Sequence, residues 1–251
     1  MDTDTANRLL DINRQFYQTF ALQFSQTRQR IQPGVKRVME NLPNEATILD
    51  LGCGNGELWR RLASQGYDGR YIGIDSSPGL LEIAAANIPK SCLTKPIFIL
   101  VDLASSNWQD CLFDSVYSSD LSAGFDFILA FAMLHHLPGR GMRLNLLRKV
   151  NQLVSPNGYF IHSEWLFLNS AKLRSRLQPW NRAGLSEDRL DEGDYLLDWR
   201  HGGSGLRYVH LFDTTELNEL AAESNFQILG SFTSDGEGGN LSLYQIWTAV
   251  K

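Results

Sequence analysis

The sequence lacks any hydrophobic run that approaches the roughly 18 to 20 residues of a membrane-spanning helix. It opens with polar and acidic residues, Met-Asp-Thr-Asp-Thr, instead of the basic and then apolar order of a secretory signal. Internal repeats and low-complexity tracts are also absent from the 251 residues. We therefore expect no membrane segment and no secretory precursor. The 43% of hydrophobic residues is enough for one substantial core.

Cysteine is scarce as well. Cys53, Cys92 and Cys111 are odd in number and lack the paired spacing of a metal site. This usage is typical of a reducing compartment, so we expect a cytoplasmic protein whose cysteines have no chemical role, and we predict no metal site. The sequence predicts no particular oligomeric state.

The most informative stretch is residues 48–56, Ile-Leu-Asp-Leu-Gly-Cys-Gly-Asn-Gly. An apolar run ends at Asp50, three alternating glycines follow, and residues 57–63 are compatible with a helix. A strand, a glycine turn and a helix start form a nucleotide-type pocket, because glycine lets the backbone approach a ligand and the helix start offers free N–H groups. Taken alone, the pattern is equally consistent with an ordinary tight turn.

The ligand predicted for this turn is positively charged. A dinucleotide site needs the spacing G-x-G-x-x-G, but the sixth residue counted from Gly52 is Glu57. Carboxylates at Asp50 and Glu57 would repel a pyrophosphate. They favour S-adenosylmethionine (SAM), which carries a sulfonium and an ammonium group and no phosphate.

Two further acids follow predicted strands. Asp75 ends the strand of residues 70–75, and Asp102 ends the strand of residues 96–102. Asp75 lies about 20 residues beyond the glycines, the spacing at which an acid receives ribose hydroxyls. Together with Asp50, these acids would lie along one edge of a parallel sheet, where open α/β sheets bind ligands.

This pattern resembles the class I SAM-dependent methyltransferases over residues 34–251. The resemblance implies an α/β fold: a Rossmann-like, seven-stranded, mostly parallel sheet with helices on both faces and an antiparallel last strand. It also implies that Asp50 serves the ammonium group and Asp75 the ribose. The remaining cofactor-binding residues that we expect are Gly52, Gly54, Gly56, Ser76, Asp102, Leu103, Ala130 and His135.

Apolar periodicity predicts the other elements. We expect one domain over residues 1–251, with an N-terminal helical extension over residues 1–43. Asp213 followed by Glu216 resembles a capping box at the start of a helix over residues 214–224. The further predicted elements are a strand at 125–131, a helix from 144 that ends at Pro156, and strands at 159–167, 226–232 and 242–250.

Residues 168–206 are additional to a minimal fold of this kind. They are rich in Arg, Asp, Gly and Trp and poor in apolar periodicity. Long irregular insertions are usually functional or disordered. We interpret this one as a substrate-recognition insertion over the ligand edge, and a mobile surface loop is the alternative.

Charge is unevenly distributed along the chain. The net charge of −5 argues against general adhesion to nucleic acid. From Arg140 to Arg182, however, there are eight basic residues and one acid, Glu164. This run predicts either a local basic face or ordinary solvated helix surfaces.

A closer resemblance rests on segments outside the cofactor motifs. The N-terminal segment contains Tyr17-x-x-Phe20, Phe24-Ser25-x-Thr27-Arg28 and Pro33-x-Val35; later come Leu134-His135-His136-Leu137, Pro179-Trp180 and Arg207-Tyr208-Val209-His210-Leu211-Phe212. These segments are similar to those of the tRNA wobble-uridine carboxymethyl methyltransferases. The resemblance implies methyl-ester formation on 5-carboxymethyluridine in the tRNA anticodon loop. It also implies a small activator protein as a partner, because eukaryotic relatives work with one. Val209 and Glu57 depart from the family, which usually has tyrosine and a basic residue there.

Methylation of a carboxylate needs no general base, because the group is already ionised at pH 7. The site must instead hold the carboxylate in line and exclude water. We hypothesise that Arg28, Arg207 or both hold it through a bidentate fork; a surface salt bridge or a phosphate contact is the alternative for each. Tyr208 is a candidate for stacking on a base, and His210 for a hydrogen bond to substrate, with core packing as the alternative for both.

Three functions remain open from the sequence. The first is a SAM-dependent methyltransferase of a tRNA carboxylate. The second is a SAM-dependent methyltransferase of a small carboxylate metabolite, which the acidic net charge favours. The third is a catalytically silent SAM-binding subunit, against which the glycines and acids count.

Overall fold

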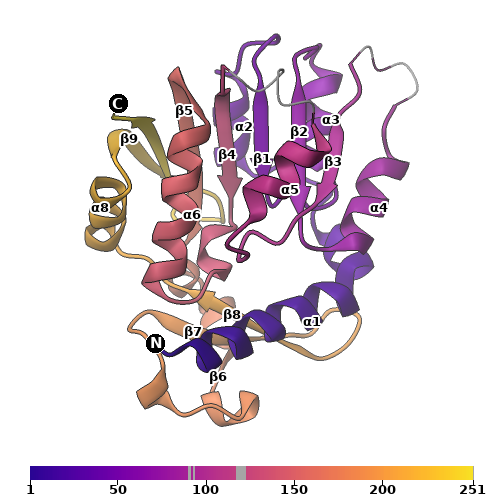
Figure 1. Ribbon diagram of the computed structural model, residues 1–251. Helices are drawn as coiled ribbons and strands as arrows, with labels where there is room; N and C mark the ends of the chain where they lie inside the picture. Colours follow the sequence, from indigo (N-terminus) through magenta and orange to yellow (C-terminus); the bar gives the residue numbers. More distant parts are fainter. Residues whose placement is uncertain (90–91, 93, 117–122, 251) are drawn as a thin grey trace.

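The computed structural model describes residues 1–89, 92, 94–116 and 123–250. A seven-stranded sheet with the order β3-β2-β1-β4-β5-β10-β9 forms its centre (Figure 1). The strands are β1 (Ile48–Leu51), β2 (Tyr71–Asp75), β3 (Ile97–Leu100), β4 (Phe125–Phe131), β5 (Val154–Trp165), β9 (Phe226–Ser234) and β10 (Ser242–Ala249). Strand β10 runs antiparallel to both β5 and β9, and the pairs from β3 to β5 are parallel. The predicted Rossmann-like sheet with an antiparallel last strand is confirmed.

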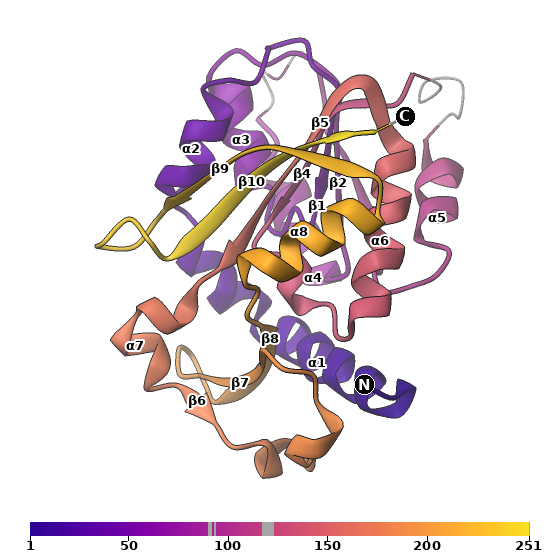
Figure 2. The same cartoon turned by 90° about the vertical axis from the view of Figure 1, so that its left-hand side faces the viewer.

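Helices cover both faces of this sheet, as predicted (Figure 2). The helices are α1 (Thr3–Thr27), α2 (Pro33–Met39), α3 (Glu57–Ser64), α4 (Pro78–Ala86), α5 (Trp108–Ser115), α6 (Arg140–Leu153) and α8 (Thr214–Glu223). One face packs against α5, α6 and α8, whose buried side chains include Trp108, Leu147 and Leu217. The other face packs against α2 and α3 through Val38 and Trp59.

One boundary and one helix cap differ from the predictions. Helix α6 ends at Leu153 and β5 begins directly at Val154, because Val154 already pairs with Phe125 of β4. Asp213 caps α8 by accepting a hydrogen bond from the Glu216 N–H at 2.7 Å. The capping box stays half-formed, since the Glu216 carboxylate contacts His210 and Arg143 instead.

The segment expected to be irregular is folded. We call residues 168–210 the cap: it contains α7 (Ala171–Arg174) and a small antiparallel sheet of β6 (Leu177–Gln178), β7 (Asp194–Trp199) and β8 (Gly205–His210). Leu197 and Val209 pack with Phe167 at the end of β5. The expectation of an irregular segment was wrong because these strands are short and carry charged side chains that become buried.

Helix α1 joins the cap to the central sheet. It runs below the carboxyl ends of the sheet strands and along the cap (Figure 1). Leu9 packs against Leu196 and Tyr208. The side chain of Asn13 accepts a hydrogen bond from the Tyr208 N–H at 2.9 Å and donates one to the Tyr208 carbonyl at 3.1 Å. Neither α1, with its 25 residues, nor any other helix in the described ranges is long and apolar enough to cross a bilayer.

The Asn13 contact predicts a stability effect. Asn13→Ala leaves a buried N–H and weakens the pairing of a buried carbonyl, so we expect the free energy of unfolding to fall by about 2 to 4 kcal/mol. Asn41→Ala removes an exposed hydrogen bond to the Arg37 carbonyl, and this control should change it by less than about 0.5 kcal/mol. Urea unfolding measures both, and an unchanged midpoint for Asn13→Ala would contradict the role of this contact.

Candidate functional site

A cavity of about 370 Å³ lies where the carboxyl ends of the sheet strands, α1 and the cap meet. Its walls come from segments far apart in the sequence. Among the predicted residues, the lining includes Arg28, Asp50, Gly52, Gly54, Asp75, Ser76, Asp102, Leu103, His135 and Arg207. The structure therefore brings ten of the predicted site residues into one place.

The glycine turn forms one wall of this cavity. Gly52 and Gly54 have φ angles of 77° and 56°, in the left-handed region that favours glycine. A Cβ on Gly54 would meet no atom within 4 Å, whereas one on Gly52 would meet Met133 at 2.8 Å. Gly56 is not among the residues that line the cavity. A Cβ on this residue would instead meet Ala84 and Phe98. We therefore correct the expectation for Gly56: this glycine allows close packing of the helix start.

Asp75 and Asp102 both lie at the cavity, as their places after neighbouring strands predict. The Asp75 carboxylate accepts hydrogen bonds from the N–H groups of Gly54 (2.9 Å) and Ser77 (2.8 Å), which fixes the glycine turn beside it. Asp102 forms an ion pair with Arg14 of α1 at 2.8 Å. The sequence analysis missed Arg14, because only the folded chain brings α1 to this edge.

Asp50 is the most deeply placed of the three acids. Its side chain is buried and accepts a hydrogen bond from the Tyr71 hydroxyl. Burial raises the pKa of Asp50 to about 7; the Tyr71 hydrogen bond opposes this rise, and the nearby Asp75 charge adds to it. This acid is therefore only partly ionised near neutral pH.

Glu57 and Ala130 do not act as the sequence suggested. The Glu57 carboxylate forms ion pairs with Arg60 and, at 2.8 Å, with Arg61, so its charge is balanced within α3. Ala130 is buried in the core on the far side of β4 and does not line the cavity. Phe131, the last residue of this strand, and Ala132 after it line the cavity instead.

Arg28 and Arg207 both line the cavity and lie close enough for their charges to interact. Arg207 is 5% exposed, and its guanidinium lies over the rings of Trp165 (5.1 Å) and Phe16 (5.2 Å). Burial and the charge of Arg207 lower the pKa of Arg28. In the part of the chain that the structure describes, neither arginine has a carboxylate within 4.0 Å. Two cations thus face the cavity without a counter-ion from the protein.

A tyrosine and a histidine lie beside the two arginines. The Tyr17 hydroxyl is 2.9 Å from His136 Nε2, and His136 Nδ1 is 3.2 Å from the Tyr208 carbonyl oxygen. A carbonyl only accepts, so Nδ1 carries the hydrogen and Nε2 accepts from Tyr17. Burial lowers the pKa of His136 to about 3, so the ring is neutral. This arrangement fixes the Tyr17 oxygen in the cavity wall.

His135 is held from behind by a buried acid. Its Nδ1 lies 3.3 Å from Glu164 Oε2, and the other oxygen of Glu164 lies 3.0 Å from His162 Nδ1. Burial lowers the pKa of His135 and raises the pKa of Glu164. Glu164 therefore orients a histidine of the cavity wall.

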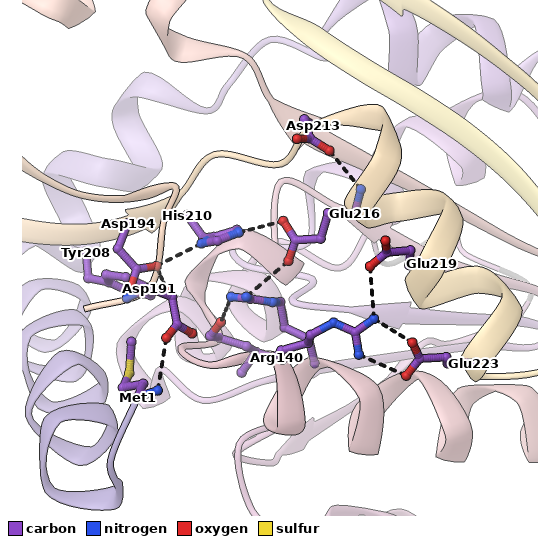
Figure 3. A network of polar contacts seen from close by, with 12 residues as sticks. Met1, Arg140, Asp191, Asp194, Tyr208, His210, Asp213, Glu216, Glu219 and Glu223 are labelled. Atoms are coloured by element: carbon purple, nitrogen blue, oxygen red, sulfur yellow. Dashed lines mark hydrogen bonds and ion pairs between the residues drawn. The ribbon is translucent and has the colours of Figure 1, made fainter. Parts of the chain in front are cut away.

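Tyr208 and His210 lie outside the cavity, contrary to our expectation. The Tyr208 hydroxyl donates to Asp194 at 2.8 Å, and His210 bridges Asp194 and Glu216 at 2.8 Å each (Figure 3). Burial alone would lower the pKa of His210, but the hydrogen bonds to these two carboxylates raise it. Neighbouring residues of a strand face opposite ways, so Arg207 reaches the cavity and Tyr208 does not.

Comparisons with known proteins show the family of this chain. The model of the methyltransferase domain family matches residues 24–230. The tRNA (carboxymethyluridine(34)-5-O)-methyltransferase of Schizosaccharomyces pombe is 25% identical over 236 residues, which cover 86% of this chain and 88% of the relative.

Solved structures share the fold. A SAM-dependent methyltransferase from Methanosarcina mazei has a TM-score of 0.63 at 22% identity, covering 88% of this chain and 99% of its own. A methyltransferase from Haloferax volcanii, solved in complex with the Trm112 methyltransferase activator, has a TM-score of 0.64 at 14% identity, covering 95% and 97%.

The pKa of Asp50 predicts a pH-dependent affinity for SAM. The Asp50 carboxyl stays protonated up to a pH of about 7, whereas an ordinary aspartate, with a pKa of 3.8, is ionised well below that pH. Only the ionised form attracts a cation. We expect SAM to bind roughly tenfold more tightly at pH 7.0 than at pH 5.5. Asp50→Asn should lose this part of the pH dependence, and calorimetry at both pH values measures it. If the SAM affinity of the two proteins changed equally with pH, Asp50 would be excluded as the source of the pH dependence.

Proposed function

This chain belongs to the methyltransferase domain family and is a SAM-dependent methyltransferase, and from that premise we propose that it forms a methyl ester on a substrate carboxylate. The carboxylate that we propose is that of 5-carboxymethyluridine at the wobble position of tRNA. The name of the Schizosaccharomyces pombe relative and the segments shared with that family support this substrate.

One observation carries the proposal: Arg28 and Arg207 face the cavity without an acidic partner among the residues that the structure describes. Burying a cation without a counter-ion is costly, so such a site favours an anionic ligand. A carboxylate fits both the charge and the fork geometry of guanidinium groups. Arg28 caps the end of α1 and Arg207 lies on β8, 179 positions further along the chain, and both line the same cavity.

The opposite wall fits SAM. Gly54 offers open space beside its backbone, and Asp50 supplies negative charge for the ammonium group of the cofactor. We propose that Asp75 binds the ribose hydroxyls and that Asp102 and Leu103 flank the adenine. When bound, SAM supplies an electrophilic methyl group on its sulfonium.

The protein's own residues then have a limited task. A carboxylate arrives ionised, so no side chain has to remove a proton. The arginines would orient its oxygen toward the methyl group, and α1 with the cap would exclude water. His136 is neutral and accepts a hydrogen bond from the Tyr17 hydroxyl. This fits a site that holds the methyl acceptor in place and leaves the protonation state of that substrate unchanged.

A free carboxylate metabolite is the second candidate substrate. The small volume of the cavity, about 370 Å³, and its cover by α1 favour a small ligand. The same arginines would hold it. We also propose that a small activator protein assists the enzyme, as the Haloferax volcanii complex suggests.

Nucleoside analysis tests the proposed substrate. The protein is incubated with labelled SAM and with tRNA from cells that lack its gene, with and without a Trm112-type activator, and the digested nucleosides are separated. We expect label in the methyl ester of carboxymethyluridine. Label that enters only free metabolites would favour the second candidate.

The arginine pair gives a separate prediction. Arg28→Ala and Arg207→Ala should each lower kcat/KM by roughly 10- to 100-fold, because each removes a charged hydrogen-bond donor, while SAM affinity stays near that of the wild type. Arg8→Ala on the exposed face of α1 serves as the control and should leave both values unchanged. Full activity in both cavity variants would rule out carboxylate binding by these arginines.

A further inference from the structure

The cap contains a stretch that is purely basic. Residues 165–186 include no acid, and their charged side chains are Lys172, Arg174, Arg176 and Arg182. The protein as a whole carries a net charge of −5, so this concentration is local. These four residues form the second half of the basic run from Arg140 to Arg182.

The structure divides that run into two parts. Arg140 forms ion pairs with Glu223 (2.7 Å) and Glu219 (3.3 Å), and buried Arg143 pairs with Glu216 at 3.1 Å (Figure 3). The charges of Arg140 and Arg143 are therefore compensated by α8, whereas Arg148 and Lys149 donate to the backbone carbonyls of Glu223 and Ser106. None of the four cap residues has a carboxylate within 4.0 Å in the described ranges.

The basic residues of the cap are held on a folded surface. Arg174 donates to the Leu168 carbonyl, and Arg182 donates to Gln178 Oε1 at 2.5 Å. The backbone carbonyl of Arg176 accepts a hydrogen bond from Asp198 of β7 at 2.9 Å. Lys172, Arg174 and Arg182 are exposed and Arg176 is partly exposed, so a ligand can reach all four.

This surface starts at the edge of the methyltransferase cavity. Trp165 lines the cavity, and the chain enters α7 a few residues later. The Leu166 N–H donates to the Leu241 carbonyl at 2.8 Å, and Leu241 also lines the cavity. Figure 2 shows α7 below the tip of the β9–β10 hairpin. A chain that leaves the cavity on this side would pass along the cap.

We propose that Lys172, Arg174, Arg176 and Arg182 form a phosphate-binding face that docks the RNA backbone beside the nucleotide held in the cavity. The inference rests on the proposed RNA substrate and adds the surface that would bind it. Phosphates suit this face because uncompensated Lys and Arg side chains gain affinity by releasing counterions from the nucleic acid. An otherwise acidic protein needs such a local face to bind RNA at all.

A variant with all four residues replaced by alanine tests the face. We expect its affinity for the modified anticodon stem-loop to fall at least tenfold, and the slope of log affinity against log salt to shrink by about two to three. SAM affinity and turnover of the free nucleoside 5-carboxymethyluridine should stay unchanged, because the cavity is untouched. Circular dichroism and the SAM titration confirm that the variant is folded.

The control removes the same number of charges elsewhere. Arg8, Lys95, Arg148 and Lys149 are replaced together by alanine, which changes the net charge equally, and RNA affinity should fall much less. If the wild type forms the ester on tRNA but both variants bind RNA equally well, the face is wrong and the proposed function stands. A wild type that forms no ester on tRNA overturns the proposed function and the face with it.

Discussion

Arg207 is the point at which the central sheet, α1 and the cap meet. Its guanidinium lies 5.1 to 6.0 Å from three aromatic rings, those of Trp165 on β5, Phe16 on α1 and Trp199 on β7. Cation–π contacts offset part of the cost of burying a charge that has no acidic partner in the described part of the chain. The rings come from three separate elements, so the guanidinium keeps its place only while α1 and the cap are docked. The cover of the cavity and its positive side therefore depend on the same packing.

Much of the fold could be predicted from the sequence because its signals are local. The turn after β1 needs positive φ angles that glycine supplies, and Pro78 and Asp213 mark helix starts through backbone geometry and capping. Acids at the ends of parallel strands lie on one edge in any sheet of this type, so Asp75 and Asp102 were placed correctly at the cavity.

The remaining features depend on contacts between distant segments. Which side of β8 faces the cavity depends on its pairing with β7 and on Asn13 of α1, and no local pattern specifies either. Tyr208 and His210 were therefore assigned to the wrong side, and Arg14 was missed. The insertion was recognised, but its strands escaped detection because buried polar residues such as Asp194 interrupt the alternation that identifies a strand.

The cavity is lined by groups of both charges, the acids Asp50 and Asp75 and the arginines Arg28 and Arg207. Esterification of a carboxylate cancels the anion of the acceptor and the sulfonium cation of the donor in a single event. In the proposed reaction Arg28 and Arg207 would then face a neutral ester where they had faced an anion, whereas Asp50 would still face the ammonium group that the demethylated cofactor keeps. The attraction that holds the acceptor ends once the bond has formed, so an enzyme built this way releases its ester through the same electrostatics that bound its carboxylate.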